Sequence, residues 1–94
     1  MLTNIVLDVH CSGIHSNDPV YRVYVDDELL TERTWVWPAH EIYIKEHIEV
    51  DIDPGKHIVK IHNCSPDNSL KFKNVTVNKQ EFAVTPTTEF TFYI

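Results

Sequence analysis

The stretch IYIKEHIEVDIDPGKHIVKIHN, from Ile42 to Asn63, decides the fold class because hydrophobic and polar residues alternate along it. One row of alternate positions is aliphatic and the other is mostly charged or polar, as in a strand with one buried face. Glu46 is the one polar residue in the aliphatic row, so we expect a bend or a strand boundary there. The aliphatic row consists of Ile42, Ile44, Ile48, Val50 and Ile52.

The same alternation recurs in the rest of the chain. Residues 5–11, 21–25 and 90–94 alternate in this way and are rich in β-branched and aromatic side chains, which strands favour. Turn-forming residues separate these runs, and no segment has a convincing helical period. The pattern predicts an all-β chain, an antiparallel β-sandwich of jelly-roll type with roughly seven to eight short strands. Its 94 residues predict a single domain, residues 1–94, because a second core would not fit.

Two local features refine this prediction. Leu70 and Phe72 share one parity, whereas Val75 and Val77 share the other. A β-bulge near residues 73–74 would reconcile the two pairs, because it adds one residue to a strand.

A turn centred on residues 54–55 predicts a hairpin in which Glu49 faces Lys60 and His47 faces His62. Two imidazoles at that spacing on a solvated face could hold a zinc or copper ion, provided that a third ligand joins them. The alternative is a pair of exposed histidines without a metal. The sequence leaves both interpretations open.

Charge and the N-terminal residues limit the expected partners and compartment. The net charge is −6 and the eight Lys and Arg residues are scattered, so we expect no nucleic-acid partner. The opening MLTNIVLDVHCSG has no basic n-region and no long apolar run, which predicts no signal peptide, no transmembrane segment and a soluble cytoplasmic protein. Cys11 and Cys64 are then expected to be free thiols, with a disulfide as the alternative.

No residue pattern predicts catalysis. The serines and Cys64 lie in loops without a glycine-rich elbow, and the two glycines are isolated. Asp26, Asp27 and Glu28 are adjacent carboxylates, but Asp tolerates turn geometry and the segment fits a hairpin turn. We therefore expect no enzyme activity.

Three aromatic residues are candidates for ligand binding. Trp35 and Trp37 in the segment TWVWP share one parity, so they lie on one face of a strand end. On the core face they would be packing residues; on the open face they would form a platform on which a sugar ring stacks, and Tyr43 could extend it. Both placements fit the sequence.

A loop rich in oxygen ligands is a candidate calcium site. Asn63, Asp67 and Asn68 supply amide and carboxylate oxygens, but calcium needs roughly six to eight ligands, so other loops would have to contribute. The alternative is an ordinary polar loop.

Three segments, taken in order, resemble small jelly-roll carbohydrate-binding modules of the calcium-dependent xylan-binding type. They are YRVYVDDELL (21–30), DIDPGKHIVKIHN (51–63) and PDNSLKFKNVTVN (66–78). The resemblance implies oxygen ligands for calcium at Asn63 and Asp67. Cys64 departs from it, because an acidic ligand is expected after the asparagine.

The chain is also similar to small uncharacterised proteins of marine tailed phages, mainly along YRVYVDDELLTERTWVWPAHEIYIKEHIEVDI. This resemblance implies a phage origin and a place in the host cytoplasm or the virion. The leading interpretation is a non-enzymatic binding module, with a glycan as a possible ligand. The alternative is a virion structural or accessory protein of the decoration type, which forms a homo-oligomer or binds a capsid or tail partner through edges such as TEFTFYI.

Overall fold

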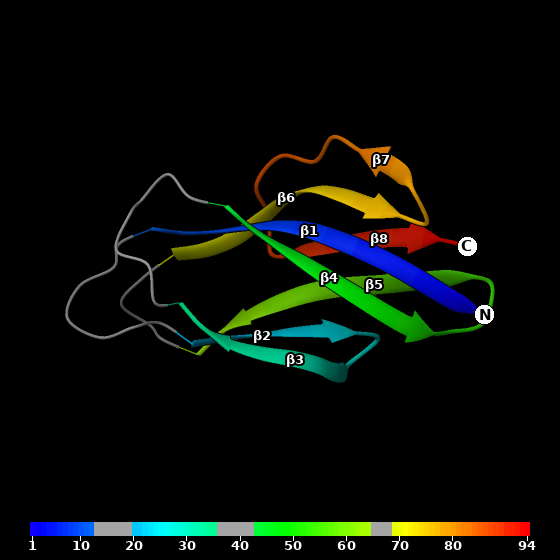
Figure 1. The fold of residues 1–94 in the computed structure, drawn as a ribbon, viewed down its shortest axis with the longest axis horizontal. Helices are drawn as coiled ribbons and strands as arrows, with labels where there is room; N and C mark the ends of the chain where they lie inside the picture. The colour runs from blue at the N-terminus through cyan, green and yellow to red at the C-terminus, as the bar shows by residue number, and fades with distance from the viewer. Residues whose placement is uncertain (13–19, 36–42, 65–68) are drawn as a thin grey trace.

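The computed structural model describes residues 1–12, 20–35, 43–64 and 69–94. These residues form two antiparallel sheets of four strands each, consistent with a sandwich (Figure 1). We call them the β1 sheet, with strand order β4-β1-β6-β7, and the β2 sheet, with order β3-β2-β5-β8. The strands are β1 (Leu2–Ser12), β2 (Val20–Val25), β3 (Glu28–Thr34), β4 (Ile44–Asp51), β5 (Lys56–Asn63), β6 (Ser69–Val77), β7 (Gln80–Phe82) and β8 (Glu89–Tyr93).

The prediction of an all-β chain is confirmed, and the alternation of the sequence corresponds to the burial of the side chains. Along β2, Tyr21, Val23 and Val25 are buried and the residues between them are partly exposed. Each aliphatic side chain moved out of water in this way contributes about 1.5–3 kcal/mol to folding. No described segment forms a helix that could cross a membrane.

The predicted hairpin between β4 and β5 is wrong. The two strands belong to different sheets, and Ile52–Gly55 crosses from one sheet to the other. Glu49 pairs with Asn4 of β1, whereas Lys60 pairs with residues of β2 and β8. The physical reason is that a Pro-Gly turn suits a two-residue hairpin poorly. Placing the strands in opposed sheets lets their two aliphatic rows face each other across the core.

Two true hairpins use left-handed turn residues. Asp26 and Asp27 join β2 to β3 with φ of 51° and 68°, which confirms the predicted turn there. Asn78 and Lys79 join β6 to β7 with φ of 48° and 71°. Positive φ at both central residues is the mark of a type I′ turn, whose twist matches that of the flanking strands.

The predicted β-bulge in β6 is confirmed. The register between β1 and β6 shifts between Val6 and Asp8, and Asn74 takes a φ of 52° at that point. The extra residue lets Phe72 and Val75 both face the core although they differ in parity.

We expect Lys79→Gly to stabilise the protein by about 0.5–1 kcal/mol, because glycine removes the steric cost of a left-handed backbone at the second turn position. Urea denaturation measures the change, with Lys79→Ala as the control that removes the side chain without relieving φ. A gain for alanine as large as that for glycine would contradict this turn geometry.

Candidate functional site

The three aromatic candidates take different places. Trp35 is fully buried in the core, so the expectation of a tryptophan platform is wrong for this residue. Its indole packs because the segment after β3 continues the inward-facing parity of the sheet. Trp37 lies outside the described residues. Tyr43 is 43% exposed just before β4 and is the aromatic candidate that a ligand can reach.

The two histidines do not form a joint metal site. His47 lies opposite Val6 on β1, whereas His62 lies opposite Arg22 on β2. Both side chains are exposed, and their neighbours in sequence face the core, so they point away from each other on the two outer faces of the sandwich. The predicted pairing fails together with the predicted hairpin. Within the described ranges, no three His, Cys, Asp or Glu residues are grouped so as to hold a metal ion.

The calcium candidates are only partly placed. Asn63 is the last residue of β5 and lies opposite Tyr21. Asp67 and Asn68 lie outside the described residues. Neither cysteine forms a disulfide, as predicted: Cys64 is exposed, and Cys11 is buried, which raises the pKa of its thiol.

On the outer face of the β1 sheet, two functional side chains lie close to Tyr43. The tyrosine ring lies 5.0 Å from the ring of His10, centroid to centroid, and 4.0 Å from the ammonium of Lys73. His10 lies on β1, Lys73 lies on β6 and Tyr43 immediately precedes β4, and β1 is the strand between β4 and β6. His10 lies opposite Lys71, and Lys73 lies opposite Asp8.

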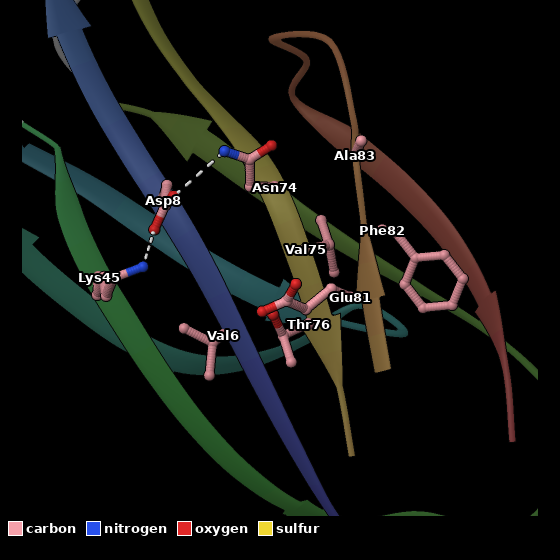
Figure 2. Close-up of a pocket in the computed structure, with 9 residues that line it drawn as sticks. All are labelled: Val6, Asp8, Lys45, Asn74, Val75, Thr76, Glu81, Phe82 and Ala83. Carbon is pink, nitrogen blue, oxygen red and sulfur yellow. Dashed lines mark hydrogen bonds and ion pairs between the residues drawn. The ribbon is translucent and has the colours of Figure 1, made fainter. Parts of the chain in front are cut away.

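Beside this cluster the face is hollowed (Figure 2). The hollow has a volume of about 490 Å³. Asp8 lies on one side of it, with the Lys45 ammonium 2.9 Å from one carboxylate oxygen and the Asn74 amide donating to the other at 3.5 Å (Figure 2). The hollow opens where β7 ends after three residues, between its last pair with β6, Val75 with Phe82, and the bridge of Phe72 with Thr87. Its lining residues are Val6, Asp8, Lys45, Asn74, Val75, Thr76, Glu81, Phe82 and Ala83.

A buried polar network joins the two sheets. Glu46 of β4 is 3% exposed, and it accepts a hydrogen bond of 2.5 Å from the Tyr21 hydroxyl of β2. The Arg33 guanidinium of β3 forms a hydrogen-bonded ion pair with the same carboxylate, and the hydrogen bond to Glu46 raises the pKa of Arg33. Burial and the neighbouring Glu46 raise the pKa of the Tyr21 phenol. The signal in the sequence is Glu46 itself, since a charge in an aliphatic row needs a buried partner. The predicted strand boundary at Glu46 is wrong, because β4 continues through it from Ile44 to Asp51.

A second network lies at the opposite end of β2. The Nδ1 of His57 pairs with the carboxylate of Asp26, and its Nε2 lies 2.5 Å from the carbonyl oxygen of Asp53. A carboxylate and a carbonyl only accept, so this arrangement favours the charged imidazole, in which both ring nitrogens donate. The hydrogen bonds to Asp26 and Asp53 raise the pKa of His57. Desolvation by burial tends to raise the pKa of Asp26, but the hydrogen bonds that its carboxylate accepts from His57 and from the Ile58 N–H lower this pKa overall.

Comparison with known proteins finds no matching family model, no matching curated protein and no matching solved structure.

We expect Glu46→Ala to lower the free energy of unfolding by about 2–3 kcal/mol, because Tyr21 loses its acceptor inside the core. Arg33 is 41% exposed and can regain water, which limits the loss. Tyr21→Phe should cost about 1 kcal/mol. Chemical denaturation compares both with Glu49→Ala, which removes an exposed carboxylate of the same strand. Similar losses at positions 46 and 49 would argue against the buried network.

Stability should fall as the pH rises through the titration of His57. The pKa of His57 is raised in the folded state, so its contribution is complete below the unfolded value of about 6.5 and is lost as the pH passes the folded value. The lowered pKa of Asp26 adds stability that is lost only as the pH falls into the acid range. Thermal unfolding from pH 5 to 9 measures the slope. His57→Gln should flatten it, and His47→Gln, which changes an exposed ring, should not.

Proposed function

We propose that this chain is a non-enzymatic β-sandwich binding module of jelly-roll type, and that it binds a glycan on the outer face of the β1 sheet. The observation that carries the proposal is the exposed ring of Tyr43 beside a hollow of about 490 Å³. The apolar face of a sugar ring packs against an aromatic side chain, while its hydroxyls need donors and acceptors fixed in place nearby.

The polar groups of the hollow meet that second need. Asp8 is held from both sides by Lys45 and Asn74, so its carboxylate is fixed at the surface. The three side chains offer a carboxylate that accepts, an ammonium that donates and an amide that can do both, within one hollow. Such a constellation on a rigid sheet favours recognition of hydroxyls whose spacing is fixed by a sugar ring.

The sheet orders support the jelly-roll part of the proposal. β1 and β4 pair in one sheet, and the segment of chain between them forms the β2–β3 hairpin of the other sheet. In the same way, β5 and β8 pair in one sheet, and the chain between them contributes the β6–β7 hairpin to the other. Two such nested units give a chain path of two Greek keys, the mark of jelly rolls. The resemblance to calcium-dependent modules adds a proposed calcium site at Asn63 and Asp67, and the residue type adds Asn68, so binding should be measured with calcium and with a chelator.

A virion structural or accessory role, in a phage-encoded protein, is the second candidate, and one observation favours it. Among the described strands, β8 pairs with β5 alone and lies at the end of the β2 sheet, so its other edge could pair with another chain. Tyr93 on this strand is 72% exposed. The burial of Trp35 also fits this role, since it removes one aromatic group from the glycan platform.

The decisive experiment compares Tyr43→Ala with Tyr24→Ala on a glycan array and by calorimetry, beside light scattering for mass. Tyr24 faces outward on the β2 sheet and is the matched control. We expect Tyr43→Ala to weaken glycan binding at least about tenfold, the loss of a stacking contact of about 1.4 kcal/mol, and Tyr24→Ala to leave it unchanged. A stable oligomer that binds no glycan, and that Tyr93→Lys dissociates, would replace this proposal with the virion role.

A further inference from the structure

We propose that the glycan recognised by the outer face of the β1 sheet is acidic and carries carboxylate or sulfate groups on its sugar rings. This inference rests on the proposed function and specifies the class of its ligand.

The argument begins with the number of basic groups around Tyr43. Lys45, Lys71, Lys73 and His10 lie on three neighbouring strands, and Asp8 is the acidic residue among them. Asp8 is paired with Lys45. Half of the six lysines of an acidic chain, with net charge −6, therefore lie at one end of one sheet face.

Two of the three lysines of this cluster, Lys71 and Lys73, have no ion pair among the described residues, and they lie two residues apart on one face of β6. On the β2 sheet, Arg22 is paired with Glu32 at 2.7 Å, and Lys60 with Asp27 at 2.7 Å. Among the described residues, Lys56 and Lys79 also have no carboxylate partner, but they lie on separate elements, at the start of β5 and in the turn between β6 and β7. A chain with an excess of acids can pair exposed lysines readily, so two adjacent unpaired ammonium groups mark a place where the positive field is open to a ligand.

The position of Lys73 connects this charge with the stacking surface. Its ammonium lies over the Tyr43 ring, 4.0 Å from the centroid, a cation–π contact that holds the charge against one face of the ring. A sugar packed on Tyr43 would place a ring carboxylate or sulfate within reach of Lys73. Lys71 follows on the same strand and the same face, about 6.6 Å further along, where it would meet a second charged group.

The rest of the molecule favours a sparse anion over a nucleic acid. A nucleic acid would carry phosphates across the whole face, where Glu49, Asp51 and Glu81 would repel them. The hollow on the β2 sheet, lined by Arg22, Tyr24, Asp27, Lys60 and His62, is a weaker candidate, because its arginine and lysine are already neutralised. An acidic glycan needs to present only one or two charges to the pair of lysines.

The test uses matched neutral and acidic ligands and the full chain. Calorimetry compares an oligogalacturonate with its fully methyl-esterified form, and a sulfated galacto-oligosaccharide with its unsulfated form. We expect at least one acidic member to bind about tenfold or more tightly than its neutral partner, and the preference to shrink between about 50 and 500 mM salt as the charges are screened. Which pair discriminates identifies the anionic group.

The variants locate the effect. Lys71→Gln with Lys73→Gln should reduce the preference for the acidic ligand at least about fivefold, since charge-assisted contacts are lost. Lys56→Gln with Lys79→Gln changes the net charge equally at distant positions and should keep the preference. Circular dichroism of both double variants checks that they fold.

Each contrary outcome has a distinct meaning. Equal binding of neutral and acidic ligands that is lost in Tyr43→Ala would overturn this inference and leave the proposed glycan function in place. No binding of any glycan, neutral or acidic, would overturn both. Tighter binding of a single-stranded oligonucleotide through Lys71 and Lys73 would overturn the choice of an acidic glycan.

Discussion

The structure depends on one constraint: each sheet has a single apolar face, and that face is shielded from water by the other sheet. The aliphatic rows of β1 and β4 meet those of β2 and β5 across the core, which is why a chain of short strands forms two layers rather than one wide sheet. The same constraint explains the buried carboxylate of Glu46. Its position in the inward row forces it between the layers, and Tyr21 and Arg33 compensate for its burial from the opposite sheet.

Much of the fold could be predicted from residue patterns, because parity is a local property. The strands, the turn at Asp26 and Asp27, and the bulge in β6 all follow from which residues neighbour which in the sequence. Partner choice is not local. Alternation predicts that Ile48 faces inward, but it does not predict which strand lies beside it. For this reason the predicted hairpin across Pro54 and Gly55 is wrong.

The candidate site was harder to predict for the same reason. Tyr43 was identified as an aromatic candidate, yet its neighbours His10 and Lys73 come from strands 33 and 30 residues away. Trp35 shows the converse limit. Parity left it on the core face or the open face, and only the assembled sandwich decides for the core. The same holds for the lysines. They look scattered along the sequence, but they gather on one face of the sheet because only β1 lies between β4 and β6.

The bulge at Asn74 has a consequence for how this chain can change. Before the bulge, β6 directs Lys71 and Lys73 outward; after it, the inward positions pass to Val75 and Val77. Deleting one residue here would turn either the lysines or the valines to the wrong side. The length of this strand is therefore fixed by two requirements at once, one for the core and one for the surface. Substitutions can therefore change the chemistry of the outer face, whereas an insertion or deletion within β6 would disrupt the core or the surface.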